Sequence, residues 1–134
     1  MIVEKDETLP VRSSDDVVRV RREVRAHAIG AGFSLVDQTK IVTAASEIAR
    51  NTVDYGGGGI LRLETVRLGV RRGVRLTFTD QGPGIADLKL ALTDGYTSGS
   101  GLGLGLSGAK RLSSEFDIKS APGEGTVVTM VRWK

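Results

Sequence analysis

The segments Asp80-Gln81-Gly82-Pro83-Gly84-Ile85 and Gly99-Ser100-Gly101-Leu102-Gly103-Leu104-Gly105 carry most of the functional information in this chain. The first segment places a carboxylate acceptor at the end of an apolar stretch that we expect to be a strand. In the second, four of the seven residues are glycines without a side chain, so the backbone amides are free to face a phosphate. The two segments together predict a nucleotide-binding site.

The size and composition of the chain set limits on this prediction. A length of 134 residues with 40% apolar residues predicts one domain over residues 1–134 with a single core. The absence of cysteine excludes disulfides and thiolate metal sites. The apolar stretches are shorter than the roughly 20 residues that span a bilayer, and residues 1–6 lack the start of an export signal. We therefore expect a soluble, cytoplasmic protein without a membrane partner.

The charge pattern gives little support to nucleic-acid binding. Nineteen basic and sixteen acidic residues leave a formal net charge of +3, and only 4% of the residues are aromatic. The one basic run contains Arg19, Arg21, Arg22 and Arg25. The face with Arg19, Arg22 and Arg25 is either a docking surface or an ordinary solvated helix face.

Hydrophobic periodicity predicts the order of the secondary-structure elements. Alternating apolar positions predict strands over residues 8–12, 60–70, 74–79, 117–120 and 126–133. Helical spacing predicts helices over residues 14–30, 34–55, 87–92 and 104–116, with a loop over 93–103. We expect an α+β, two-layer sandwich with a mixed, mostly antiparallel sheet and helices on one face.

Helix caps and turn residues add detail to this outline. Ser13 or Ser14 is the expected cap of the first helix, and Ser34 forms a capping box with Asp37 at the start of the second. We expect the first central hairpin to turn at residues 71–73 and the last hairpin at residues 121–125. The side chains expected to face the core are Ile41, Ala44, Ala45, Ile48, Thr52, Tyr55, Leu76, Phe78, Leu106, Ala109, Leu112 and Phe116.

The polar face of the second helix contains Glu47, Arg50, Asn51 and Asp54, which are three or four residues apart. If the apolar face of this helix packs on the sheet, Glu47 and Asn51 point together into a cleft. An amide oxygen such as that of Asn51 suits Mg²⁺, which takes few protein ligands in addition to phosphates and waters. The carboxylate of Glu47 could accept a proton from an attacking hydroxyl. The alternative is a solvated helix face.

The glycine loop over residues 99–105 is either a flexible connector or a phosphate cradle. The leucines that alternate with its glycines would anchor it, and it continues directly into a helix N-terminus, which favours an anion site. Residues 103–108 match the dinucleotide-binding spacing only formally, because no strand precedes them. The Walker pattern fails at Ala109, where it requires lysine.

Asp80 taken alone is consistent with ordinary turn chemistry. The order of four motifs carries more information: Glu47-x-x-Arg50-Asn51, Asp80-x-Gly82-x-Gly84, Gly101-x-Gly103-x-Gly105 and Gly123-x-Gly125-Thr126. This order resembles the Bergerat or GHKL fold of ATP-binding proteins, which includes histidine kinases, gyrase, Hsp90 and MutL. The form of the first two motifs, and Lys110-Arg111-Leu112 after the glycine loop, are most similar to RsbT-type serine-protein kinases.

The resemblance implies a role for each residue that matches a motif. Asp80 would accept a hydrogen bond from the adenine amino group, with support from Thr126. Gly82 and Gly84 would let the backbone pass close to the base. The phosphates would be wrapped by amides around Gly101, Leu102, Gly103, Leu104 and Gly105. Asn51 would hold Mg²⁺ and Glu47 would be the catalytic base, whereas Arg50 matches the motif without an assigned role.

The resemblance also implies an ATP- and Mg²⁺-dependent serine/threonine protein kinase. Its substrate would be a STAS-domain partner (RsbS/RsbR-like, as in stressosomes), and on release it would activate an RsbU-like phosphatase in sigma-factor or second-messenger signalling. No nucleic-acid or membrane partner is implied. The alternatives are an anti-sigma factor with kinase activity (RsbW/SpoIIAB-like) that sequesters a sigma factor, and a non-catalytic ATP-dependent adaptor.

Three features refine the resemblance. A chain that ends at Lys134, just after the last strand, favours the RsbT type over the anti-sigma type. The only histidine, His27, lies within a helix and is expected to be a surface or half-buried structural residue, which argues against histidine-kinase chemistry. The glycines at positions 56–59 suggest a loose exit from the second helix, which leaves the positions of Asp54 and Tyr55 open.

Overall fold

The computed structural model describes residues 1–85, 87–92 and 105–134. Its five strands form one sheet in the order β1-β2-β3-β5-β4. The strands are β1 (Ile2–Val11), β2 (Gly59–Leu68), β3 (Arg71–Asp80), β4 (Glu115–Ser120) and β5 (Thr126–Trp133). The helices are α1 (Ser14–Gly30), α2 (Leu35–Asp54), α3 (Leu88–Ala91) and α4 (Gly105–Arg111).

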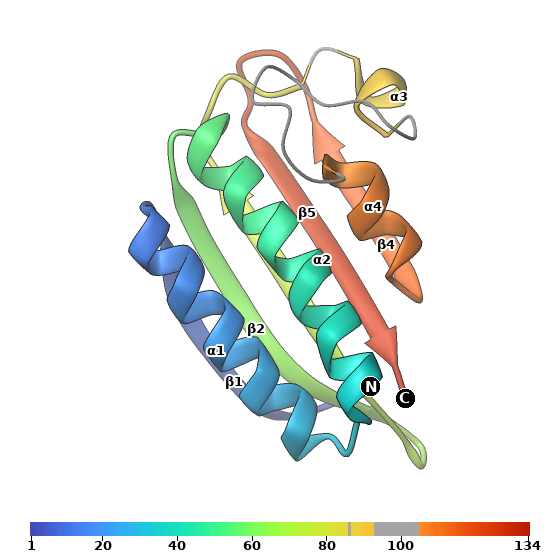
Figure 1. The fold of residues 1–134 in the computed structure, drawn as a ribbon. Helices are drawn as coiled ribbons and strands as arrows, with labels where there is room; N and C mark the ends of the chain where they lie inside the picture. Colours follow the sequence, from blue (N-terminus) through green and yellow to red (C-terminus); the bar gives the residue numbers. More distant parts are fainter. Residues whose placement is uncertain (86, 93–104) are drawn as a thin grey trace.

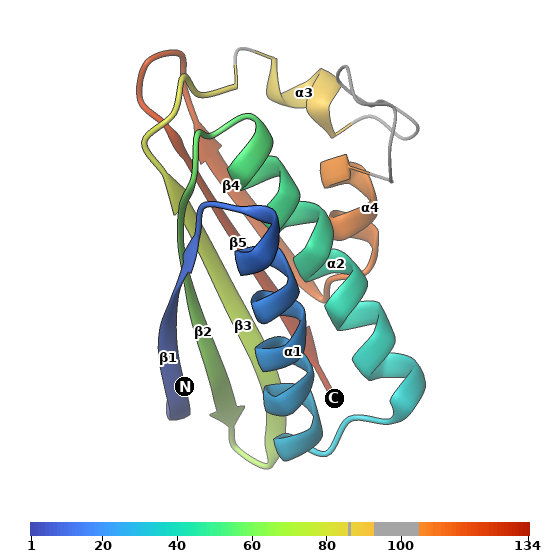
Figure 2. The same cartoon turned by 60° about the vertical axis from the view of Figure 1, so that its left-hand side comes forward.

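The sheet is covered on one face by α1, α2 and α4, and the short α3 lies beyond one end of it (Figure 1; Figure 2). The predicted two-layer α+β fold with helices on one face is confirmed. The sheet was expected to be mixed and mostly antiparallel, and all four strand pairs of the described part are antiparallel. None of the helices in the described ranges is long and apolar enough to cross a membrane.

The core lies between this sheet and the helices. Cross-strand neighbours share a face, so the paired positions Leu61, Phe78 and Val128 form one apolar row under α2. From the helix side, Ile41 and Ile48 of α2 are fully buried against the same cluster. Burial of one such side chain contributes about 1.5–3 kcal/mol. The predicted inward positions of α2 are therefore confirmed, except for Tyr55, whose exposed fraction is 43%.

Both long helices begin at the predicted caps. Ser13 is the N-cap of α1 and its side chain accepts a hydrogen bond from the amide of Asp16. Ser34 caps α2 in the same way, with the amide of Asp37 as donor. Each cap satisfies an amide that the first turn leaves without a helical partner.

Two predicted boundaries among the first three strands are wrong. The first strand is longer than expected and spans Ile2–Val11, because it pairs with β2 along nearly its whole length. The central hairpin turns at Gly69 and Val70, not at residues 71–73. Gly69 has a φ of 63°, which a two-residue hairpin turn requires, whereas Gly73 lies inside β3 against the indole of Trp133.

The fourth helix is shorter than predicted. It ends at Arg111, and Phe116 belongs to β4 instead of to the helix. The backbone changes direction because the amide of Ser114 donates to the carbonyl of Val131, which begins the pairing with β5. Leu112, just after α4, and Phe116, in β4, are nevertheless partly buried and both pack against the core.

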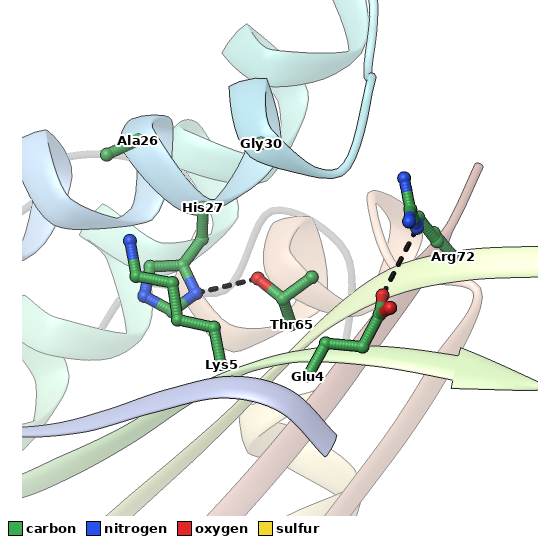
Figure 3. Close-up of a pocket in the computed structure, with 7 residues that line it drawn as sticks. All are labelled: Glu4, Lys5, Ala26, His27, Gly30, Thr65 and Arg72. Carbon is green, nitrogen blue, oxygen red and sulfur yellow. Dashed lines mark hydrogen bonds and ion pairs between the residues drawn. The ribbon is translucent and has the colours of Figure 1, made fainter. Parts of the chain in front are cut away.

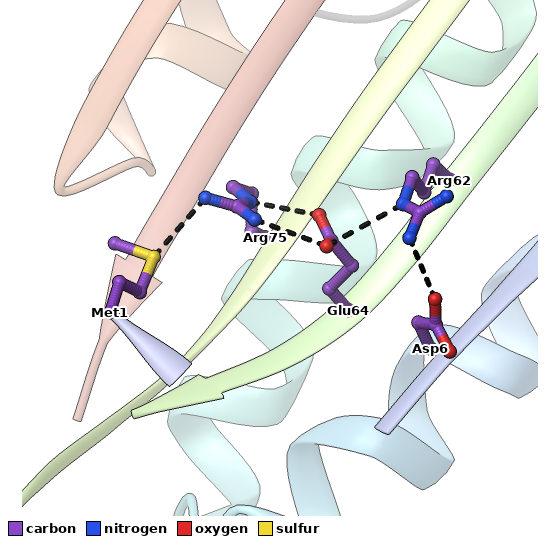
Figure 4. A network of polar contacts seen from close by, with 5 residues as sticks. All are labelled: Met1, Asp6, Arg62, Glu64 and Arg75. Atoms are coloured by element: carbon purple, nitrogen blue, oxygen red, sulfur yellow. Dashed lines mark hydrogen bonds and ion pairs between the residues drawn. The ribbon is translucent and has the colours of Figure 1, made fainter. Parts of the chain in front are cut away.

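The open face of the sheet has a charged network (Figure 4). Glu64 of β2 and Arg75 of β3 are directly opposite each other and form two hydrogen bonds of 2.8 and 3.0 Å. This bidentate contact lowers the pKa of Glu64 and raises that of Arg75. Arg62 lies 3.5 Å from Glu64 and 2.7 Å from Asp6, so the network ties together the first three strands.

Candidate functional site

The candidate site lies where β3 ends, β5 begins and α2 ends. Asp80, the last residue of β3, pairs with Gly59 on one side and with Thr126 on the other. Because directly opposite residues share a face, the side chains of Asp80 and Thr126 lie side by side on the helix-covered face. Their exposed fractions are 8% and 7%, so both polar residues are buried at the edge of the hydrophobic core.

The carboxylate of Asp80 is positioned by two glycines. The amide of Gly82 donates to Oδ1 at 2.9 Å. Oδ2 lies 2.4 Å from the place where a Cβ on Gly56 would be, and a Cβ on Gly82 would lie 2.6 Å from the carbonyl oxygen of Gly56. The expectation of a loose exit from α2 is therefore wrong at Gly56, where only glycine fits.

The loop after Asp80 is fastened to the hairpin between β4 and β5. Gly84 has a φ of 77°, and a Cβ there would lie 2.0 Å from the carbonyl oxygen of Ala121. The amide of Gly123 donates to the carbonyl of Pro83 at 2.7 Å, and that of Ile85 donates to Ser120 Oγ, also at 2.7 Å. Gly82 and Gly84 thus allow parts of the protein to approach each other closely, and their predicted approach to a base stays a prediction.

Ser120 is a site residue that the sequence motifs did not indicate. Besides the amide of Ile85, its hydroxyl contacts the carbonyl of Gly125 at 2.9 Å and Thr126 Oγ1 at 2.8 Å. The predicted hairpin contained a signal for it, because residues 120 and 126 flank the predicted turn and so lie opposite each other. Ser120 and Thr126 are paired in the structure.

The polar face of α2 separates into buried and exposed parts. The side chain of Glu47 is 12% exposed, which is too buried for a purely solvated face. Its Oε2 accepts a hydrogen bond from the amide of Gly105 at 3.3 Å, and Oε1 lies 3.7 Å from Nη1 of Arg50. Asn51, one turn after Glu47, is half-buried, whereas Arg50 and Asp54 are exposed. The structure thereby brings Glu47 to the first residue of α4.

The glycine loop is described only at its end. Gly105 begins α4 and has a φ of 64°. The predicted phosphate-binding positions Gly101, Leu102, Gly103 and Leu104 lie outside the described residues.

The donor set for a metal is small. Within residues 1–85, 87–92 and 105–134, no group of three or more His, Cys, Asp or Glu side chains is arranged to hold a metal ion. A single amide oxygen from Asn51, half-buried on the same face of α2 as Glu47, fits an ion that takes its remaining ligands from phosphates and water.

A second polar cluster lies at the other end of the sheet, around His27 (Figure 3). His27 is 1% exposed, so it is fully buried and not at the surface or half-buried as expected. Its Nδ1 lies 2.8 Å from Thr65 Oγ1, and its Nε2 lies 3.8 Å from an oxygen of Glu7. Burial is the main cause that lowers the pKa of His27, and the nearby charge of Lys5 adds to it. These contacts make His27 a structural residue between α1 and the sheet.

The chain is similar to known proteins over most of its length. The family model described as histidine kinase-, DNA gyrase B-, and HSP90-like ATPase matches residues 36–134. The chain is 42% identical over 118 residues to the serine/threonine-protein kinase RsbT of Bacillus subtilis (strain 168), which covers 88% of this chain and 89% of that protein. It is 33% identical over 125 residues to the anti-sigma F factor of Pasteuria penetrans, covering 89% and 83% of the two chains.

Solved structures share the fold at lower identity. A structure of the RsbU and RsbW domains of a Mycobacterium tuberculosis protein aligns over 97% of this chain, with a TM-score of 0.65 and 22% identity. This chain spans 33% of that structure's chain. The mycobacterial sensor histidine kinase MprB aligns over 96% of this chain, with a TM-score of 0.56 and 18% identity.

Proposed function

Because the chain belongs to the family of histidine kinase-, DNA gyrase B- and HSP90-like ATPases, and within it to the RsbT-type serine/threonine-protein kinases, we propose that it transfers the γ-phosphoryl group of ATP to a serine or threonine of a STAS-domain protein. The single observation that carries the proposal is the contact between Glu47 and Gly105. It places a largely buried carboxylate at the end of the glycine loop where the phosphates are expected.

The base would be recognised at the other end of the site. Asp80 Oδ1 accepts a hydrogen bond from the amide of Gly82, and Oδ2, which has no hydrogen bond from the described residues, would accept from the adenine amino group. Thr126, directly opposite Asp80, would support this contact. Gly82 and Gly84 would keep the loop backbone close to the base. The amides of residues 101–104 would surround the phosphates, since the amide of Gly105 donates to Glu47.

In the proposed reaction, Glu47 accepts the proton of the substrate hydroxyl as the hydroxyl oxygen forms its bond to the γ-phosphorus. The bond from that phosphorus to the bridging oxygen breaks, and ADP leaves. Asn51 would hold Mg²⁺, which screens the charge of the phosphate oxygens when bound. The main contributions of the protein are alignment of the hydroxyl and amide donors aimed at the phosphates.

The proposed partners are a STAS-domain scaffold or antagonist of the RsbS/RsbR kind and an RsbU-like phosphatase that the released kinase activates. The similarity to RsbT supports this assignment, and the exchange between the two partners would take place in the cytoplasm. The second candidate is an anti-sigma factor that sequesters a sigma factor. The 33% identity to an anti-sigma F factor favours it.

A phosphotransfer experiment tests the proposal. The purified chain is incubated with Mg²⁺, γ-labelled ATP and the STAS-domain protein encoded nearest to it, beside Glu47→Ala and the control Glu23→Gln on α1. We expect label on serine or threonine of the partner with the wild type and the control, and its loss with Glu47→Ala. Stable capture of a sigma factor without transfer to a STAS protein would favour the anti-sigma function instead.

A further inference from the structure

The hydroxyl of Ser120 has three close partners, and together they define where its hydrogen lies. A serine hydroxyl has one hydrogen to donate and two lone pairs that accept. The amide of Ile85 can only donate, so it occupies one lone pair of Oγ. The carbonyl oxygen of Gly125 can only accept, so the single hydrogen of Ser120 points to it.

The third contact then has only one possible direction. Ser120 has given its hydrogen to Gly125, so the 2.8 Å contact with Thr126 requires Thr126 to donate into the remaining lone pair of Ser120. The hydrogen of the Thr126 hydroxyl is thereby directed away from a ligand. Thr126 presents lone pairs alone to the site.

Asp80 adds a second acceptor beside it. The two residues are directly opposite in the β3–β5 pair, and Oδ2 of Asp80 has no hydrogen bond from the described residues. An ionised carboxylate only accepts. Among the described residues, the side chains of Asp80 and Thr126 therefore offer acceptors alone at this corner of the site.

We propose that Ser120 is a positioning residue for nucleotide selectivity: by holding the Thr126 hydrogen, it makes the base-binding corner accept a 6-amino purine and reject a 6-oxo purine. This inference rests on the proposed function, because it assumes that the base lies at Asp80. The amino group of adenine brings two N–H donors to the corner. The carbonyl of hypoxanthine would bring another acceptor and leave buried acceptors facing one another, which is unfavourable.

The test compares the dissociation constants of ATP and ITP on the full chain by titration calorimetry with Mg²⁺ present. In Ser120→Ala the Thr126 hydroxyl is free to rotate and donate to the 6-oxo group. We expect the preference for ATP over ITP to fall about tenfold, the size of one buried hydrogen bond gained or lost. Ser120→Thr keeps a hydroxyl and should restore the preference.

The ratio of the two constants separates selectivity from a general structural effect. A loosened loop at Ile85 would weaken both nucleotides together and leave the ratio unchanged. Ser113→Ala is the matched control, because it removes a partly buried hydroxyl that donates to Ala109 outside the site. If Ser120→Ala does not fold, Ser120→Cys replaces it, since a thiol of similar shape donates and accepts weakly.

The possible outcomes distinguish the role of Ser120 from the proposed function. A reduced preference in Ser120→Ala or Ser120→Cys, kept in Ser120→Thr and Ser113→Ala, supports the inference. An unchanged preference in Ser120→Ala, or a wild type that binds ITP as tightly as ATP, overturns it while ATP binding stands. A wild type that binds neither nucleotide overturns the proposed function itself.

Discussion

Glu47 on α2 accepts a hydrogen bond of 3.3 Å from the backbone amide of Gly105, the first residue of α4. The two residues are far apart in the sequence, and only the packing of α4 beside α2 brings them together. The contact joins the proposed catalytic carboxylate to the end of the glycine loop. Variants at this site can therefore be tested separately for their effect on phosphotransfer and for their effect on ATP binding.

Glu47→Gln keeps the size of the side chain and an oxygen for the amide of Gly105, but it removes the basic carboxylate. We expect kcat for phosphotransfer to fall about 10²–10⁴-fold, the usual contribution of a positioned general base. The dissociation constant of ATP should change little. Single-turnover kinetics with calorimetry measure both quantities, and an unchanged kcat would exclude Glu47 as the base.

Asp80→Asn replaces the acceptor proposed for the adenine amino group with a side chain that also donates. We expect ATP binding to become too weak to detect by calorimetry. The thermal unfolding temperature should stay near that of the wild type. Asp117→Asn, at an exposed position of β4, is the control and should bind ATP normally. Retained ATP affinity in Asp80→Asn would place the adenine elsewhere.

Gly56→Ala tests the close packing behind Asp80. A Cβ at this position would lie 2.4 Å from Oδ2 of Asp80 and 2.7 Å from the carbonyl of Thr52. We expect it to displace the carboxylate, weaken ATP binding by at least tenfold and destabilise the fold by about 1–3 kcal/mol. Gly30→Ala is the matched control, because nothing lies within 4 Å of its Cβ position. Equal ATP affinity in both variants would contradict the packing argument.

Asn51→Ala tests the metal assignment. If the amide oxygen is a magnesium ligand, removing it should flatten the dependence of ATP affinity on Mg²⁺ concentration and leave the affinity without Mg²⁺ almost unchanged. Calorimetric titrations at several Mg²⁺ concentrations measure this dependence. If ATP affinity depends on Mg²⁺ concentration equally steeply in the variant and the wild type, Asn51 is not a magnesium ligand.

His27 predicts how stability depends on pH. Burial and Lys5 lower its pKa below the ordinary 6.5, while Glu7 and Glu23 act in the opposite direction. The unfolded chain therefore takes up a proton at a higher pH than the folded chain. The free energy of unfolding should decrease as pH falls below 6.5, until pH passes the folded-state pKa.

The slope of that decrease has an upper limit of about 1.4 kcal/mol per pH unit for one proton. Urea unfolding of the wild type and of His27→Gln between about pH 7.5 and pH 5.5 measures it. Since His27 is the only histidine, the variant should show a flatter profile. Parallel profiles would mean that His27 does not carry the pH dependence.

Much of the fold follows from local rules that operate within a few residues. Ser13 and Ser34 begin their helices because their hydroxyls satisfy first-turn amides, and this is visible in sequence. The predictions of turns and element ends are wrong where two local patterns compete. Gly69 and Gly73 both suit a turn, and the packing of Trp133 on Gly73 decides which of them turns. Phe116 continues a helical spacing, yet pairing with β5 makes it a strand residue.

The family, the order of the elements and the candidates Glu47, Asn51, Asp80 and Thr126 could all be predicted from the sequence, because chemistry-bearing residues occur in it in a recognisable order. Only the folded structure shows that Asp80 lies against Gly56, that Gly56 must be glycine, and that the amide of Ile85 reaches Ser120. These are contacts between segments distant in sequence. Their geometry depends on strand register and helix packing, which no local pattern encodes.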